Sequence, residues 1–168
     1  MKTHLSISIF VLVEIVVAAF ILYTIGNLPE NIASHFNGAG MPNGFMSRAG
    51  YTRFMLVFAV GIPALVVCSI SLVVRLASGS INVPHKEYWL SPENKASAIQ
   101  FLQGHVAGLG ILIASFMAYI HWLLIKANSV QPPLLPNNLL FAGLGIFLVS
   151  MLLWALWLVV RFMRVPKA

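Results

Sequence analysis

Four long apolar segments constrain this chain more than any other feature of its sequence. Each is long enough to cross the hydrocarbon core of a bilayer, which requires about 20 helical residues. They cover residues 5–25, 52–77, 98–125 and 138–162. Only 8% of the residues are charged and 60% are hydrophobic, whereas a soluble domain carries roughly 25% charged residues. The sequence therefore predicts an all-α, four-helix integral membrane bundle that forms one domain over residues 1–168.

The basic residues predict an orientation for this bundle. They stand singly at the ends of the apolar segments, and lysine and arginine are retained on the cytoplasmic side of a membrane. Seven of them flank one face, namely Lys2, Arg75, Lys86, Lys95, Arg161, Arg164 and Lys167. Three flank the other face, namely Arg48, Arg53 and Lys126. We expect both termini and the 78–97 connection in the cytoplasm, the 26–51 loop outside, and no direct binding of nucleic acid.

The 26–51 loop is rich in residues that interrupt regular structure. It contains five glycines and two prolines, a density that excludes a long helix or a regular strand. Pro42-Asn43-Gly44 predicts a tight turn, because proline presets one backbone dihedral and glycine relieves another. Apolar residues such as Leu28 and Ile32 predict that the loop folds down onto the helix ends.

The 78–97 connection carries two further signals. Tyr88 and Trp89 are predicted to be interfacial anchors, since amphipathic rings favour the headgroup level. Ser91-Pro92-Glu93 is typical of a helix start, with serine as N-cap and proline in the first turn. The third membrane helix is therefore expected to begin before the bilayer and to enter it near residue 98.

The third apolar segment is rich in small residues and is predicted to lie at the centre of the bundle. Gly104 and Gly108 form a pair, four residues apart, that lets another helix backbone approach closely. The second segment contains Gly61 and Pro63, which predict a kink near its middle.

Glu14 is the most informative single residue, because an ionisable group inside a membrane helix is costly unless it is paired or neutralised. By the rise of 1.5 Å per residue, it lies about 13 Å from the start of its helix. His105 enters from the same side to a depth of about 10 Å, so the two side chains could meet. Such a pair would relay protons or bind a polar ligand, or it would serve as a structural contact between helices.

The sequence gives little support for a metal, a cofactor or an enzyme. His105 and His121 are 16 residues apart, which places them about 160° apart around a helix and on nearly opposite faces, unsuited to haem. In the loop, only Glu30 and His35 offer zinc ligands, fewer than the three or four that such a site needs. The motifs of common hydrolases and nucleotide-binding proteins are missing from the sequence.

The loop also resembles a known family. The resemblance rests on Leu28-Pro29, Ile32, His35-Phe36-Asn37, Gly40, Pro42, Asn43-Gly44, Phe45 and Ser47-Arg48. This pattern is similar to a bacterial membrane domain of unknown function found at the N-terminus of SdpI-type immunity proteins. A second similarity lies in Asn82-Val83-Pro84 and the following Lys86–Leu90 segment. The resemblance covers residues 5–95, with Phe45 where the family usually has tryptophan and Arg48 where it often has lysine.

This resemblance implies a protein of the bacterial inner membrane and a role in protection against a membrane-active toxin. Three hypotheses follow. The first is a binding module whose outer loop meets a peptide toxin, a lipid or a protein. The second is an accessory subunit of a larger membrane assembly or homo-oligomer, packed through Gly104 and Gly108. The third is a proton-coupled carrier that uses Glu14 and His105.

Overall fold

The computed structural model describes residues 3–77 and 79–165. Two of the basic residues used to predict the orientation, Lys2 and Lys167, lie outside this part of the chain. Four helices are long and apolar enough to cross a membrane, as expected for a multi-pass membrane protein. They span Thr3–Asn27, Arg48–Leu76, Lys95–Asn128 and Asn137–Met163. The four predicted apolar segments are thus confirmed as four long helices.

The elements follow one another in a simple order. The first helix consists of α1 (Thr3–Thr24) and a short 3₁₀ turn η1 (Ile25–Asn27), and it leads into strands β1 (Asn31–Phe36) and β2 (Pro42–Ser47). The second is continuous through α2 (Arg48–Leu56), η2 (Val57–Gly61) and α3 (Ile62–Leu76). The short helix α4 (Lys86–Trp89) precedes α5 (Lys95–Asn128) and α6 (Asn137–Met163).

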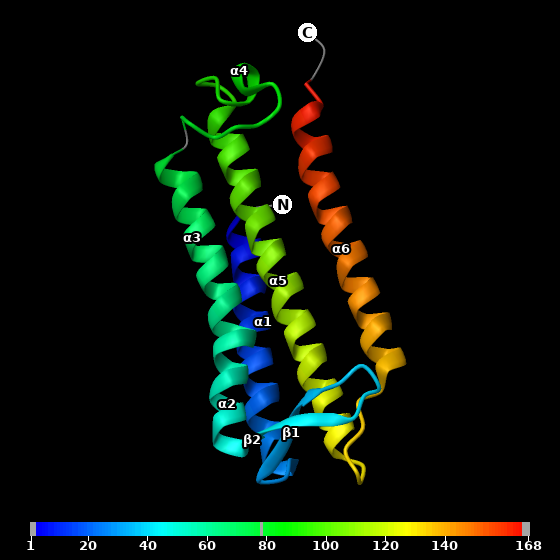
Figure 1. Ribbon diagram of the computed structural model, residues 1–168. Coiled ribbons are helices and arrows are strands. Elements are labelled where there is room, and N and C mark those ends of the chain that lie inside the picture. Colours follow the sequence, from blue (N-terminus) through cyan, green and yellow to red (C-terminus); the bar gives the residue numbers. More distant parts are fainter. Residues whose placement is uncertain (1–2, 78, 166–168) are drawn as a thin grey trace.

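Helix α5 lies at the centre, as its small residues predicted. It packs against α1, α3 and α6 (Figure 1). Helices α1 and α5 run in the same direction, because Thr3 bonds to the carbonyl of Gln100 and Thr24 contacts His121. Both contacts join residues 97 apart in the sequence, so the two helices keep one register along their length.

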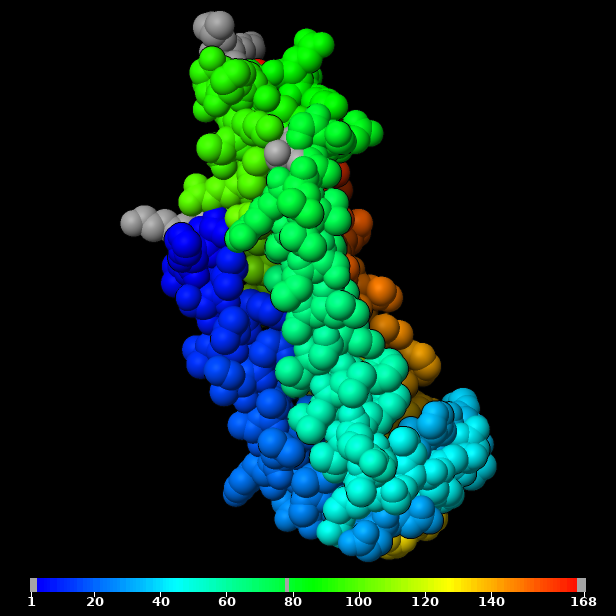
Figure 2. Space-filling view, turned by 90° about the vertical axis from the view of Figure 1, so that its left-hand side faces the viewer, coloured from blue at the N-terminus to red at the C-terminus, as the bar shows by residue number. Residues whose placement is uncertain are grey.

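Helix α6 stands apart from the other three and rests mainly on α5 (Figure 1). None of its central apolar stretch is buried within the molecule, and side chains such as Ile146 and Leu152 are well exposed. In contrast to α6, helix α1 and the helix formed by α2 and α3 lie side by side along the molecule (Figure 2).

The 26–51 loop forms a β-hairpin, which corrects the prediction that this segment holds no regular strand. Strands β1 and β2 pair antiparallel, with Asn31 opposite Ser47 and Ala33 opposite Phe45. The chain reverses at Asn37–Gly40, and Pro42-Asn43-Gly44 lies within β2, so the predicted turn was also misplaced. The glycines are accommodated because register irregularities on both sides of His35 interrupt the regular ladder. The bundle is therefore mostly helical but not all-α.

The structure adds detail to one local prediction about helices and corrects another. The irregularity near Gly61 and Pro63 is a π-helical turn, η2, in which Ile62 N–H bonds to the carbonyl of Val57. Regular helix α5 starts at Lys95, later than the Ser91 start that the sequence predicted. The carbonyl of Ser91 instead accepts bonds from Asn94 and Lys95 in the preceding turn.

The core consists of three apolar clusters arranged along α5. The hairpin-end cluster includes Val17, Ile21, Leu28, Ile32, Tyr51, Met55, Ala59 and Ala114. The middle cluster consists of Phe10, Val67, Val106 and Ala107, and the α4-end cluster of Val74, Trp89, Ala98, Leu102 and Phe162. The loop packs down as predicted, because Leu28 and Ile32 are buried in the first cluster.

At Gly110, helix α5 is in close contact with α1 and α3. A Cβ added there would lie 2.5 Å from Val67 Cγ2 and 2.6 Å from Phe10 Cε2. Gly104 is less tight, with Ser6 Oγ of α1 at 3.3 Å, and Gly108 faces Trp154 of α6 at 3.9 Å. Within this chain Gly104 thus faces α1 and Gly108 faces α6.

Gly110→Ala should destabilise the protein, because the added methyl group overpacks the contact between α1, α3 and α5. We expect a loss of about 1–3 kcal/mol in the free energy of unfolding. Gly145→Ala in α6 is the matched control, since a Cβ there has nothing within 4 Å. Chemical denaturation of both variants in detergent micelles measures the difference, and equal stabilities would contradict the close approach at Gly110.

Candidate functional site

The hairpin is fixed to the end of α5 by one side chain, Asn128. Its amide oxygen accepts a bond from Ala33 N–H at 2.9 Å, and its amide nitrogen donates to the carbonyl of Ala33 at 3.0 Å. The same amide nitrogen also donates to the carbonyl of Leu124 at 2.9 Å. Asn128 thus occupies the place of a third strand beside β1, and all of these groups are buried.

Two further contacts hold the ends of the hairpin. At its base, the N–H of Arg48 donates to the carbonyl of Glu30 at 2.9 Å, and their side chains form an ion pair at 3.2 Å. Glu30 is 83% exposed, so the ion pair itself contributes little. At its tip, Leu135 N–H donates to the carbonyl of Gly40 at 2.9 Å. The hairpin is therefore held at its base, its middle and its tip.

Several residues of the loop motif serve the shape of the hairpin. The side-chain oxygen of Asn37 accepts bonds from the N–H groups of Ala39 and Met41, both at 3.0 Å, which fixes the turn. Gly40 has φ +79°, and a Cβ there would lie 2.6 Å from the carbonyl oxygen of Leu135. Only glycine fits both conditions. Gly44 lies under His35 of the other strand, whose Cβ would be 3.1 Å from an added Cβ.

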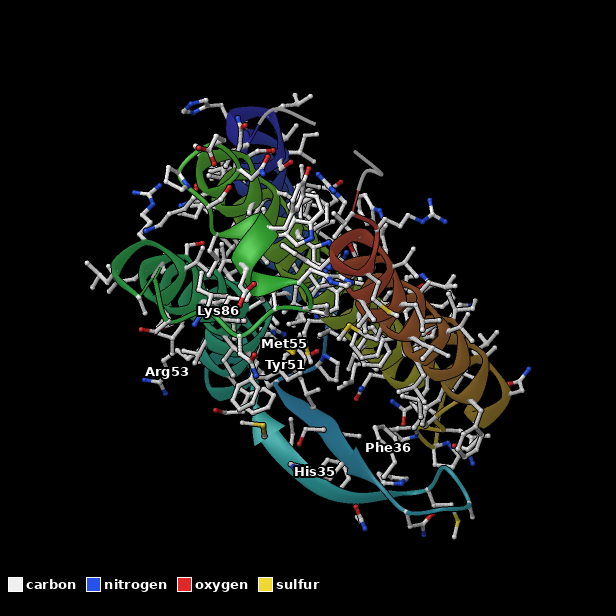
Figure 3. The ribbon with its side chains drawn as sticks, turned by 90° about the horizontal axis from the view of Figure 1, so that it is seen from above. His35, Phe36, Tyr51, Arg53, Met55 and Lys86 are labelled. Carbon is white, nitrogen blue, oxygen red and sulfur yellow. The ribbon has the colours of Figure 1, made fainter. Side chains whose placement is uncertain are left out.

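The opposite edge of the hairpin pairs with no other strand in the part of the chain that the structure describes. In an antiparallel pair, opposed residues either exchange both backbone bonds or direct these groups away from each other. Since both backbone groups of Ala33 bond to Asn128, its pairing with Phe45 is of the second kind. The N–H and C=O of Phe45 therefore point away from β1, along the outer edge of β2, which Figure 3 shows on the side away from the helices.

Apolar side chains accompany this free edge. Phe45 is 52% exposed and Met41 is 54% exposed, while His35 and Asn43 are exposed on the same hairpin. Phe36 and Pro42 are half-buried. Met41, Pro42 and Asn37 also border a groove of about 610 Å³, whose other wall is the 130–134 segment between α5 and α6. The hairpin thus combines a rigid attachment with an exposed apolar surface.

Beneath the hairpin lies a buried chain of polar groups that the sequence did not indicate. His121 of α5 is fully buried; its Nδ1 lies 2.8 Å from the Tyr51 hydroxyl and its Nε2 lies 2.8 Å from the Thr24 hydroxyl. The Thr24 hydroxyl also donates to the carbonyl of Phe20 at 2.7 Å. Figure 3 shows Tyr51 and Met55 directed toward the interior of the bundle.

One proton assignment satisfies every group in this chain. Because Thr24 donates to the Phe20 carbonyl, its oxygen accepts from the Nε2–H of His121. Nδ1 then has a free lone pair that accepts from the Tyr51 hydroxyl. The neutral imidazole thereby links α1, α2 and α5. From the sequence, His121 was considered only as a haem ligand, and nothing local in the sequence indicates its two distant partners.

The expected pair of Glu14 and His105 does not form. Neither carboxylate oxygen of Glu14 and neither ring nitrogen of His105 has a hydrogen-bond partner among residues 3–77 and 79–165. The constant register between α1 and α5 places Glu14 level with Ile111. His105 lies six residues earlier, about 9 Å away along the helix axis. The depths predicted for Glu14 and His105 agreed only approximately, and the observed register of α1 against α5 places the two side chains at different heights.

Glu14 and His105 occupy different surroundings. Glu14 is 8% exposed and lies on the buried face of α1 between Phe10 of the middle cluster and Val17 of the hairpin-end cluster. His105 stacks on Trp154 of α6, with ring centroids 4.4 Å apart, and on Phe101 at 5.4 Å. Trp154 also donates to the backbone carbonyl of His105 at 3.0 Å.

The predicted anchors at the other end differ from each other. Tyr88 is half-buried, whereas Trp89 is only 4% exposed. Its indole N–H donates to the carbonyl of Phe162 at 2.8 Å, and the guanidinium of Arg161 lies 4.3 Å from its ring centroid. Trp89 therefore attaches α4 to the end of α6 instead of standing exposed at an interface.

The polar residues do not gather into a metal centre in the part of the chain that the structure describes. No three histidine, cysteine or acidic side chains among residues 3–77 and 79–165 lie close enough to hold an ion.

Outside the apolar helices, Glu93 is a fully exposed acid. Bonds from its own backbone amide and from the Ser91 hydroxyl lower its pKa.

Comparison with known proteins gives a match to a family model. The family model described as "Domain of unknown function (DUF1648)" matches residues 12–65, less than half of the chain. The match covers most of α1, the whole hairpin and the beginning of the second long helix, including every residue of the loop motif. This supports a membrane-type domain of unknown function in that region. No curated protein and no solved structure shows a significant match.

Tyr51→Phe should destabilise the bundle, because it leaves Nδ1 of His121 buried without a donor. We expect a loss of about 1–3 kcal/mol in the free energy of unfolding. Tyr23→Phe in α1 is the matched control, since Tyr23 is 83% exposed. Denaturant titration in detergent compares the two, and an equal effect of both substitutions would contradict the assigned hydrogen-bonded chain.

Asn128→Ala should loosen the hairpin without unfolding the helices, because it removes both bonds to the backbone of Ala33. We expect the Ala33 amide to exchange with deuterium about ten-fold faster or more, as for the loss of a buried bond of roughly 1.4 kcal/mol. Asn43→Ala on the exposed side of β2 serves as control. Unchanged exchange in Asn128→Ala would show that other contacts hold the hairpin.

Proposed function

We propose that this chain is a non-enzymatic protein of the bacterial inner membrane that binds an extended peptide along the free edge of β2. The proposal rests on one observation above all. Asn128 closes the edge of β1, while the backbone groups of Phe45 are directed outward from β2. An exposed strand edge accepts a further strand through backbone bonds, and neighbouring side chains give the pairing its specificity.

The exposed apolar side chains on the hairpin favour the view that this surface is covered by a binding partner and not by water. Phe45 and Met41 would contact alternate side chains of the added strand, and the groove beside Asn37 and Pro42 would receive its continuation. The rigid attachment of the hairpin lowers the entropic cost of binding, because little of the surface has to become ordered.

The orientation follows from charge. Among the described residues, Arg75, Lys86, Lys95, Arg161 and Arg164 lie toward the α4 end, and Arg48, Arg53 and Lys126 toward the hairpin end. The excess at the α4 end favours a cytoplasmic position for that end and for both termini. The hairpin would then face the outside, where a membrane-active peptide toxin arrives. The resemblance to the SdpI-type immunity proteins supports the same reading, a protective role.

A second candidate function is that of an accessory subunit, and one observation favours it. Helix α6 contacts little besides α5 and leaves most of its apolar surface uncovered. A helix of a partner protein or of a second copy would fit there as well as lipid does. The carrier hypothesis is weaker, because the register separates Glu14 from His105 and neither side chain has a hydrogen-bond partner among residues 3–77 and 79–165.

Phe45→Asp should abolish protection, because a charge beside the β2 edge opposes the burial of an apolar peptide. Loss of a central aromatic anchor costs about 2 kcal/mol or more, or roughly 30-fold in affinity. The measurement is survival of a deletion strain of the source bacterium, complemented with each variant and challenged with the membrane-active peptide toxins of its own species.

Ala49→Asp adds the same charge at an exposed position just outside the hairpin and is the matched control. It should protect as the unmodified protein does, at equal abundance in the membrane. Full protection by Phe45→Asp would refute the role of the β2 edge. If the deletion strain survives every toxin unprotected, the immunity role itself falls, and the accessory-subunit candidate takes its place.

A further inference from the structure

Two hollows lie along the seam between α5 and α6. Nearer the α4 end is a cavity of about 110 Å³, and nearer the hairpin is a groove of about 270 Å³. On α5 the lining residues follow one helical face, from His105 and Gly108 to Leu112 and Phe116. Spacings of three and four residues keep them on that face. The cavity and the groove therefore lie in line along the same face of α5.

The cavity carries polar groups that the protein leaves unused. Both ring nitrogens of His105 and the hydroxyl of Ser6 are buried without a hydrogen-bond partner among the described residues. His105 is 4% exposed and Ser6 is 1% exposed. Most buried polar groups are satisfied, and each exception calls for an explanation such as a ligand. Here two such side chains, from α1 and α5, border the same cavity.

The walls of the cavity are aromatic and uncharged. Trp154 lies nearly parallel to the imidazole of His105, at 14°, and Trp157 meets it edge-on at 71°. Phe101 completes this aromatic wall at 20° to the imidazole. The nearby Arg161 is engaged with the rings of Trp89 and Phe101, and no charged residue lines the cavity. A flat, uncharged group suits these walls better than a phosphate.

The groove suits a hydrocarbon chain. Its walls are mostly apolar, with Leu112 and Phe116 on α5 facing Ile146 and Phe147 on α6. The Tyr119 hydroxyl on its border already donates to the carbonyl of Leu139. The occupant of the whole seam would thus have a small polar head and a long apolar tail.

We propose that the α5–α6 seam binds an isoprenoid quinone. Its ring is flat and uncharged and stacks within the aromatic wall of the cavity. Its carbonyl oxygens accept hydrogen bonds from the Ser6 hydroxyl and from the N–H of His105. Its isoprenoid tail follows the groove between Leu112 and Ile146. The cavity that would hold the ring lies nearer the α4 end than the hairpin, and its lining residues are not part of the proposed peptide surface.

Titration of the purified full-length protein with decylubiquinone, a short-tailed quinone, tests this inference. Quinones quench indole fluorescence at short range, and Trp154 and Trp157 border the cavity. We expect saturable quenching by decylubiquinone. His105→Phe keeps the flat apolar ring but removes the hydrogen-bond donor, and should weaken binding about ten-fold or more. Ser6→Ala should weaken it less, and both variants should stay folded, since each removes an unsatisfied polar group.

His35→Phe on the exposed hairpin is the matched control and should bind as the unmodified protein does. Decanol and phosphatidylglycerol, titrated against the quinone, should fail to displace it. Three results would overturn the proposal. The first is non-saturating quenching that is equal in all variants, which indicates partition into the micelle only. The second is an unchanged affinity in both His105→Phe and Ser6→Ala. The third is displacement by decanol or phosphatidylglycerol, which assigns the seam to an alcohol or a phospholipid tail.

Discussion

The hydrogen-bonded chain through His121 is the contact on which the hairpin end of the molecule depends. An imidazole can accept with one nitrogen and donate with the other, so it joins two hydroxyl groups without leaving either unsatisfied. Here it joins Tyr51 of α2 to Thr24 of α1 from a position on α5. In an apolar interior such groups cannot bond to water instead, so they must bond to one another. These bonds fix the register of three helices at once.

The hairpin depends on that register in turn. Asn128 lies two helical turns beyond His121 on α5 and reaches Ala33 only if α5 ends at this height relative to α1. Ile32 and Leu28 pack in the same apolar cluster as Tyr51 and Met55. The loop motif therefore has two parts, a set of residues that shape and anchor the hairpin, and a smaller set, with Phe45 at its centre, that faces outward.

At the other end of the molecule, helix α6 is held by contacts of a different kind. Helix α6 is attached by aromatic contacts and by indole bonds to backbone carbonyls, through Trp154 to His105 and through Trp89 to Phe162. Between these contacts hollows remain along the seam, although nearer the hairpin Gly143 of α6 packs tightly against the Tyr119 ring of α5. Tight packing also occurs on the other faces of α5, where Gly110 meets Phe10 and Val67. Helix α5 is thus closely packed toward α1 and α3, and its face toward α6 combines close contacts with hollows.

The sequence by itself determined the four long helices, the central place of α5 and the inward folding of the 26–51 loop, because hydropathy, residue size and segment length are local properties. It did not determine the β-hairpin, since the glycines that argue against a strand are accommodated by Asn37, Asn128 and the irregular register. It also suggested that Glu14 and His105 meet, from depth alone. Only the tertiary structure decided that His121 has two partners and that Glu14 and His105 have none, because the register and rotation of packed helices depend on side chains from segments far apart in the chain.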